Sequence, residues 1–193
     1  MFNCMIAGVG GQGTVLASKL IAAAAMSRGF NARTAETIGM AQRGGSVVSH
    51  VRVGAEIFSP VIPLGGADLL IAFEPAEGVR QLKYLSKGGL MVVCENAVKP
   101  ASGALGGNTY DAGEMLAYLR ASVSNLITAN GAELAGENIK TLNVALLGIA
   151  AGSGKFPFEA GAFEEALQQM INPRFLEMNI KAFEGGKNRW TIH

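Results

Sequence analysis

The glycine segment GVGGQG at residues 8–13 constrains the fold more than any other part of this sequence. It follows a short apolar run at residues 2–7 and precedes residues 14–28, whose apolar side chains recur at helical spacing. Glycine allows the tight turn that such a junction between a strand and a helix needs. Because Gly29 is a helix stop signal and residues 31–38 have strand character, the pattern predicts a βαβ unit.

The rest of the chain alternates between predicted strands and helices. Residues 46–58 are interpreted as an antiparallel hairpin, because apolar and polar residues alternate there up to a turn at Gly54 and Ala55. The other expected elements are strands at 67–73, 89–94 and within 125–134, and helices at 75–85, 141–151, 158–170 and 173–185. This order predicts an α/β fold with a mostly parallel sheet, an antiparallel hairpin and a helical C-terminal part from about residue 141.

Composition bounds the kind of protein. The length of 193 residues suits a single domain over residues 1–193, and a net charge of +1 argues against nucleic acid or membrane surfaces as partners. Charged residues make up 16% of the chain, against roughly 25% in an ordinary soluble domain. Either the core is large and rich in Gly and Ala, or, as we favour, part of the surface is covered by partner chains or by self-association. With neither a signal peptide nor a membrane span in the sequence, a cytoplasmic location is expected.

The first glycine segment is compatible with dinucleotide binding. Gly8, Gly10 and Gly13 follow the G-x-G-x-x-G pattern between a strand and a helix, and Glu36 lies where a Rossmann domain carries its ribose-binding acid. The same glycines could instead serve only close packing of strand and helix. The hairpin predicted at residues 46–58 argues against a Rossmann domain, which needs a further parallel strand there.

A second glycine-rich segment, GMAQRGGSV, begins at Gly39. Arg43 lies between glycines, where its guanidinium can bind an anion or a carboxylate of a partner through two hydrogen bonds. An ordinary exposed loop arginine is the alternative interpretation.

No catalytic residue and no metal ligand are predicted for this chain. His50 and His193 lack the spacing of a metal site, and Cys4 and Cys94 lie within apolar runs without any C-x-x-C pattern. The sequence also lacks the thiamine diphosphate, P-loop and G-x-S-x-G motifs. We therefore expect the chain alone to bind no cofactor and to be inactive.

Four segments together resemble one known family. They are GVGGQG at 8–13, GMAQRGGSVVSHVRVG at 39–54, SPVIPLGGADLLIAFEP at 59–75 and TLNVALLG at 141–148. In this order they are similar to the gamma-type subunits of 2-oxoacid:ferredoxin oxidoreductases, and most closely to the beta subunit of indolepyruvate oxidoreductases. The resemblance covers residues 2 to about 150.

This resemblance implies a three-layer α/β/α domain similar to domain III of pyruvate:ferredoxin oxidoreductase. It also implies partner subunits that carry thiamine diphosphate, magnesium and iron–sulfur clusters. The assembled enzyme would decarboxylate a 2-oxoacid oxidatively, form an acyl-coenzyme A and pass electrons to ferredoxin. A further possibility is that the first glycine turn binds an anionic group of coenzyme A or of a diphosphate at the helix N-terminus.

The resemblance also indicates which residues bind a cofactor or face the active site of the partner. In the first segment these are Gly8, Gly10, Gly11, Gln12, Gly13 and Thr14, and in the second Met40, Gln42, Arg43, Gly44, Gly45 and Ser46. Ile38 departs from the family pattern, since indolepyruvate relatives often have histidine there. An apolar side chain cannot donate to an anion, so other aryl or branched 2-oxoacids stay open as substrates.

Overall fold

The computed structural model describes residues 1–37, 45–98, 110–135 and 138–189. Its six strands form one sheet in the order β2-β3-β1-β4-β5-β6. The strands are β1 (Phe2–Val9), β2 (Asn31–Thr37), β3 (Ser46–Gly54), β4 (Ala67–Ala72), β5 (Leu85–Cys94) and β6 (Leu126–Ala129). The helices are α1 (Thr14–Ser27), α2 (Pro75–Gln81), α3 (Ala112–Ser122), α4 (Gly131–Ala135), α5 (Leu142–Gly152), α6 (Gly161–Met170) and α7 (Pro173–Lys187), with short 3-10 turns at Leu82–Tyr84 and Ile139–Thr141.

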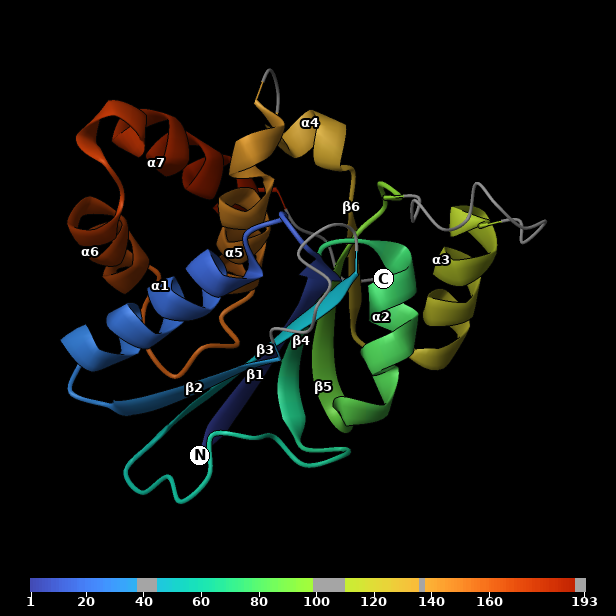
Figure 1. Cartoon of the computed structure of the whole chain (residues 1–193), viewed down its shortest axis with the longest axis horizontal. Helices are drawn as coiled ribbons and strands as arrows, with labels where there is room; N and C mark the ends of the chain where they lie inside the picture. Colours follow the sequence, from blue (N-terminus) through green and yellow to red (C-terminus); the bar gives the residue numbers. More distant parts are fainter. Residues whose placement is uncertain (38–44, 99–109, 136–137, 190–193) are drawn as a thin grey trace.

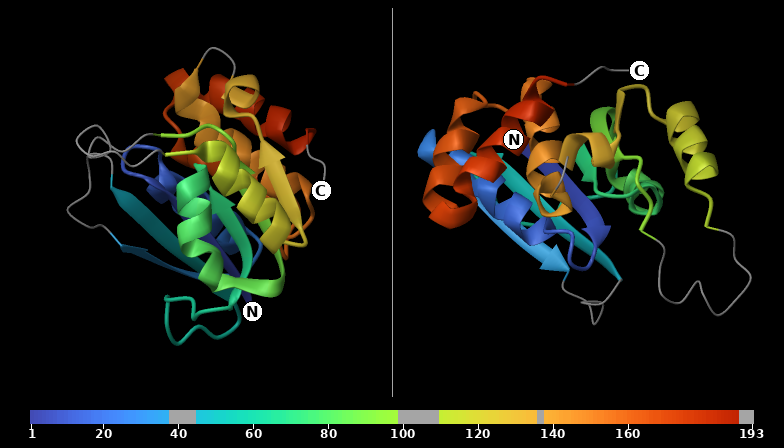
Figure 2. Two further views of the ribbon diagram at one scale, coloured as in Figure 1. Left: turned by 90° about the vertical axis from the view of Figure 1, so that its right-hand side faces the viewer. Right: turned by 90° about the horizontal axis from the view of Figure 1, so that it is seen from above.

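Helices cover both faces of the sheet (Figure 1). Helices α1, α5, α6 and α7 lie on one side, and α2 and α3 lie on the other, as the left view of Figure 2 also shows. Strand β1 explains this arrangement, because Cys4 and Ile6 belong to one buried cluster while Met5 and Ala7 belong to the other. A strand that is apolar on both faces must be covered on both faces. The predicted three-layer α/β/α class with a mostly parallel sheet is confirmed.

Strand β3 is the exception to the parallel arrangement. It pairs antiparallel with β1, where Cys4 is opposite Val51, and antiparallel with β2, where Thr34 is opposite Val51. The expected hairpin within residues 46–58 was therefore wrong in its second strand. After Gly54 the chain enters an irregular connection, because the Arg52 guanidinium donates to the carbonyl oxygen of Ser59 over 2.8 Å and holds it beside β3.

Other boundaries also differ from the sequence prediction. The strand expected within 125–134 ends at Ala129, because the Asn130 side chain caps α4 by accepting from the backbone N–H of Ala132 over 3.0 Å. Helix α3 was not predicted, although Asp111 begins it as a conventional N-cap that accepts from Gly113 N over 2.8 Å. The helices expected in the C-terminal part are present as α5, α6 and α7.

Helices α5 and α7 are in contact through their backbones. A Cβ added to Gly148 on α5 would lie 2.1 Å from the carbonyl oxygen of Phe183, and one added to Gly186 on α7 would lie 2.0 Å from that of Ala145. Neither distance leaves room for a methyl group. This contact holds α7 against α5, which is buried along its length between α7 and the sheet.

We predict that Gly148→Ala and Gly186→Ala each lower the free energy of unfolding by about 3 kcal/mol, because backbone atoms would have to move apart. Gly185→Ala is the matched control, since its Cβ meets nothing within 4 Å. Alanine in a helix interior should stabilise by roughly 0.5–1 kcal/mol at that position. Urea unfolding measures the free energy of unfolding of all three variants. Equal changes in Gly185→Ala and Gly186→Ala would contradict the backbone contact between α5 and α7.

His50 provides a pH-dependent contribution to stability. The side chain is buried under the 55–66 connection, where its Nδ1 accepts a hydrogen bond from the backbone N–H of Ile62 over 3.2 Å. Burial lowers the pKa of His50, so the folded chain favours the neutral ring. Above pH 6.5, about the pKa of histidine in the unfolded chain, His50 is neutral in both states and the fold keeps its full stability. As the pH falls below that value, the unfolded chain binds a proton more readily than the folded one, so the free energy of unfolding decreases.

We therefore predict that the melting temperature falls more steeply between pH 7.5 and 5.5 in the natural chain than in His50→Asn. The asparagine Oδ1 can replace Nδ1 as the acceptor for Ile62 N but does not titrate. Parallel melting curves for the two proteins over this range would show that His50 does not carry the effect.

Candidate functional site

The first glycine turn lies at the carboxyl end of β1, where β4 and β5 also end. Ligands bind open α/β sheets at this edge. The second glycine segment reaches the same place, because the backbone N–H of Gly10 donates to the carbonyl oxygen of Gly45 over 2.9 Å. Val9 and Ser46 are paired in the β1–β3 register just below that bond. The two glycine segments therefore meet, as their shared role in the sequence prediction requires.

The Gln12 side chain holds the first turn together. Its Oε1 accepts from the backbone N–H of Val9 over 2.6 Å, and its Nε2 donates to the carbonyl oxygen of Phe73 over 3.2 Å. This amide therefore joins the ends of β1 and β4. Gly8 has to be glycine for the same reason, since a Cβ there would lie 2.9 Å from Gln12 Oε1 and 3.2 Å from Phe73 Cβ.

Gly13 connects the first segment to the fourth. Its φ of 82° is in the left-handed region, and an added Cβ would lie 2.4 Å from Asn143 Nδ2. Asn143 is 5% exposed, and its Nδ2 donates to the carbonyl oxygen of Gly13 over 3.4 Å. The buried Thr14 then begins α1. Sequence reasoning did not single out Asn143, although it is an amide between Leu142 and Val144 at the start of an apolar helix.

Two buried carboxylates lie at the N-terminus of α2. Glu74 is 1% exposed and accepts from Glu77 N over 2.5 Å as the helix cap, and the Tyr110 hydroxyl donates to its other oxygen. Glu77 is 2% exposed and accepts from Ser46 Oγ over 2.5 Å and from the Arg80 guanidinium. Sequence reasoning missed both, although Pro75 at the first helical position and an acidic Glu77 in the first turn are recognisable signals of a helix start.

The environment of these groups shifts their pKa values. Burial raises the pKa of Glu74, while the hydrogen bond from Tyr110 opposes that change. Burial also raises the pKa of Tyr110, and its bond to the Glu74 carboxylate raises it further. The Tyr110 hydroxyl is therefore held as a donor to Glu74 at neutral pH.

A cavity of about 600 Å³ opens beside the first turn. Its polar side chains are Gln12, Asn96, Lys140 and Asn143. Gly11 is exposed at this cavity with a φ of 99°, and nothing lies within 4 Å of the Cβ it lacks. A ligand or another polypeptide can therefore approach the backbone of the turn closely at Gly11.

The structure thus places Gly8, Gly10, Gly11, Gln12, Gly13, Thr14, Gly45 and Ser46 at one end of the sheet. Their roles differ: Gly11 is open, whereas Gly8, Gln12, Gly13 and Ser46 are in contact with other parts of the fold. The remaining expected residues, Met40, Gln42, Arg43 and Gly44, lie outside the described residues, as does Ile38.

The dinucleotide interpretation of Glu36 fails on topology. In a Rossmann domain β2 lies next to β1, but here β3 separates the two strands. Glu36 is on the edge strand, where one carboxylate oxygen accepts from Ser18 Oγ on α1 over 3.1 Å. Its role in the described structure is to join β2 to α1.

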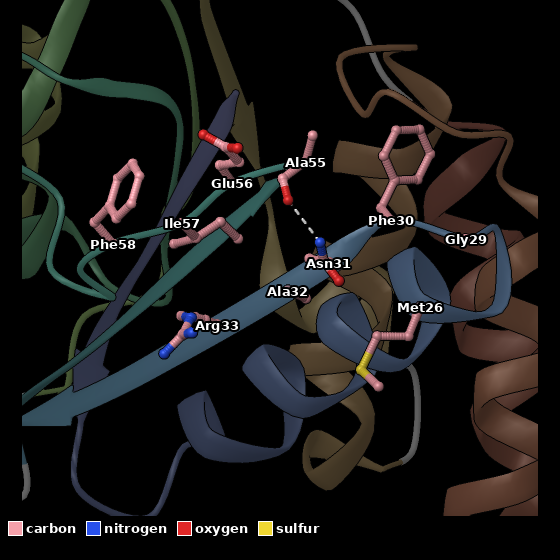
Figure 3. Close-up of a pocket in the computed structure, with 10 residues that line it drawn as sticks. All are labelled: Met26, Gly29, Phe30, Asn31, Ala32, Arg33, Ala55, Glu56, Ile57 and Phe58. Atoms are coloured by element: carbon pink, nitrogen blue, oxygen red, sulfur yellow. Dashed lines mark hydrogen bonds between the residues drawn. The ribbon is translucent and has the colours of Figure 1, made fainter.

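A second hollow, of about 880 Å³, lies at the opposite end of the sheet. Figure 3 shows its lining, which comes from the end of α1, the start of β2 and residues 55–58 after β3. Asn31 Nδ2 closes one side by donating to the carbonyl oxygen of Ala55 over 2.6 Å. None of the described residues of the two glycine segments lines this hollow, whereas Gly11, Gln12 and Gly13 line the smaller cavity, which we therefore take as the candidate site.

Comparison with known proteins assigns the family. The sequence model of pyruvate ferredoxin/flavodoxin oxidoreductase matches residues 3–189. Indolepyruvate oxidoreductase subunit IorB of Archaeoglobus fulgidus is 40% identical over 190 residues, which are 97% of this chain and 94% of that protein. This chain belongs to the pyruvate ferredoxin/flavodoxin oxidoreductase family. The resemblance seen in the sequence is confirmed.

Solved structures of two oxidoreductases share this fold. Pyruvate oxidoreductase subunit PORC from Thermotoga maritima superposes with a TM-score of 0.72 at 21% identity, covering 99% of this chain and 97% of that one. The 2-oxoglutarate:ferredoxin oxidoreductase from Magnetococcus marinus, solved with 2-oxoglutarate, coenzyme A and succinyl-CoA bound, has a TM-score of 0.66 at 20% identity. It covers 96% of this chain, which corresponds to 30% of that longer chain.

The described residues contain no arrangement of side chains suited to a metal ion. Across residues 1–37, 45–98, 110–135 and 138–189, no group of three His, Cys, Asp or Glu side chains is arranged to hold a metal ion. Cys4 and Cys94 are free and buried, and burial raises the pKa of each thiol. Within the same part of the chain, every helix is too short or too polar to cross a bilayer.

We predict different outcomes for two glycines of the first turn. Gly13→Ala should lower the free energy of unfolding by about 3 kcal/mol, since it adds a clash with Asn143 to a left-handed φ. Gly11→Ala should cost only about 1–2 kcal/mol, the backbone penalty alone. Thermal and urea unfolding compare the two variants, and a larger cost at Gly11 would contradict this assignment.

Proposed function

We propose that this chain is the small subunit of a thiamine-diphosphate-dependent 2-oxoacid:ferredoxin oxidoreductase. Its two glycine turns form one wall of a reaction centre whose cofactors are bound by partner subunits. The observation that carries this proposal is the exposed Gly11 turn beside the 600 Å³ cavity. There the chain offers open backbone to another molecule, while Gln12 and Asn143 bond to the backbone of the turn.

The proposed role of the chain is to bind and orient groups. Thiamine diphosphate on a partner would supply the carbon chemistry of 2-oxoacid decarboxylation, and iron–sulfur clusters would take up the electrons for ferredoxin. The N-terminus of α1 follows the turn and has no side-chain cap, so its N–H groups favour an anion. Lys140 adds a positive charge at the same cavity. Coenzyme A or a diphosphate has the anionic groups that such a place would bind.

The names of the relatives support a substrate class. Proteins named indolepyruvate oxidoreductase subunit IorB are 33–40% identical to this chain, which favours an aryl 2-oxoacid. Ile38 in place of the histidine noted above keeps branched 2-oxoacids as alternatives. We place the assembled enzyme in the cytoplasm, together with its ferredoxin.

The proposal predicts that the purified chain does not reduce a low-potential dye with any 2-oxoacid, even when thiamine diphosphate and coenzyme A are supplied. Activity should appear when the chain is produced together with its cofactor-bearing partner subunits. Dye reduction with indolepyruvate, phenylpyruvate and branched 2-oxoacids measures the activity of the isolated chain and of the assembled enzyme. Turnover by the isolated chain, or full turnover by the partners without it, would exclude this role.

A pair of variants tests the cavity within the same assay. Lys140→Gln should raise the KM for coenzyme A several-fold, because a charge within reach of the phosphates is removed. Lys83→Gln is the matched control, since Lys83 lies over the Tyr84 ring away from this cavity. Equal KM values in the two variants would remove coenzyme A from the proposed site.

A further inference from the structure

Glu77 is a buried carboxylate that does not line the cavity. Ionised carboxylates are costly to bury unless other groups bond to them. Here the Ser46 hydroxyl donates to one oxygen over 2.5 Å, and the Arg80 guanidinium donates to the other. The position of Glu77 therefore determines where Ser46, a residue of the second glycine segment, is held.

The bond between Ser46 and Glu77 is continued into the first turn. Gly45, next to Ser46, accepts from Gly10 N over 2.9 Å, and Ser46 pairs with Val9 across the β1–β3 ladder. A shift of the Glu77 carboxylate would thus be passed through Ser46 and Gly45 to the Gly10 amide. These contacts form a continuous path from α2 to the exposed turn.

A second path returns to α2 from the same turn. Gln12 donates to the carbonyl oxygen of Phe73, and Phe73 precedes Glu74, the residue that caps α2 and bonds to Glu77 N. The two paths form a closed ring of hydrogen bonds through three strand ends and one helix end. Within this ring, Glu77 is the side chain that bonds to Ser46.

We propose that Glu77 is a positioning residue that, acting through Ser46, sets the spacing between the first glycine turn and the backbone at Gly45 and Ser46. It does not touch the groups bound in the cavity. The relevance of this spacing to turnover rests on the proposed function. The spacing itself is a property of the isolated chain.

The test combines amide exchange with kinetics in four variants: Glu77→Met, Glu77→Gln, Ser46→Ala and the double variant of Ser46→Ala with Glu77→Met. Methionine matches the length of glutamate without an acceptor, whereas glutamine keeps an oxygen there and should restore part of the effect. Glu165→Met is the matched control, since that carboxylate pairs with Arg28 on the far helices. We expect the Gly10 amide to exchange roughly tenfold faster in Glu77→Met and in Ser46→Ala.

The double variant separates positioning from general stability. If Glu77 acts through Ser46, the double variant should exchange Gly10 no faster than the faster single variant. Additive effects would overturn the proposal, as would unchanged exchange in Ser46→Ala, a mild change that the fold should survive. In the assembled enzyme we expect Glu77→Met and Ser46→Ala each to lower kcat/KM roughly tenfold, and Glu77→Gln to lower it less. Faster exchange with unchanged kinetics would support the role of Glu77 in spacing and would contradict instead the proposed place of the first glycine turn in the reaction centre.

Discussion

The carboxyl edge of the sheet depends on two side-chain amides, Gln12 and Asn143, which bond to the backbone in the volume that side chains at Gly8 and Gly13 would need. Gln12 joins the ends of β1 and β4 through one amide. Gly8 and Gly13 are glycines because Gln12 and Asn143 occupy the volume a Cβ would need. Glycine is therefore needed at Gly8 and Gly13 for packing, whereas at Gly11 it leaves the backbone open to a ligand.

This difference explains why the G-x-G-x-x-G pattern was ambiguous. Pattern and context are the same in a dinucleotide domain and here, since both need a tight turn between a strand and a helix. What separates them is the insertion of β3 between β1 and β2, which displaces Glu36 to the sheet edge. Strand order depends on contacts between residues far apart in the sequence, so local periodicity could not reveal it. The alternation of residues 46–53 did predict a strand, but not its partners.

Much of the architecture could be predicted, because buried parallel strands such as residues 67–73 and 89–94 have strong apolar patterns. Helix α3 and the short α4 were missed because their stability depends on the caps Asp111 and Asn130 more than on a long apolar face. The candidate site was predicted as far as the two glycine segments. Glu77 and Asn143 were not found, because each acts through a hydrogen bond to a residue far away in the sequence, Ser46 and Gly13 respectively.

The backbone contact between α5 and α7 has a mechanical consequence. Helices separated by side chains can slide past one another by changes of rotamer, but Gly148 and Gly186 leave no such layer between these two. A push or pull on α7 at the surface is therefore transmitted to α5 as a rigid displacement. Because α5 carries Asn143 in its first turn, the same force reaches Gly13 and the start of α1 without passing through the sheet.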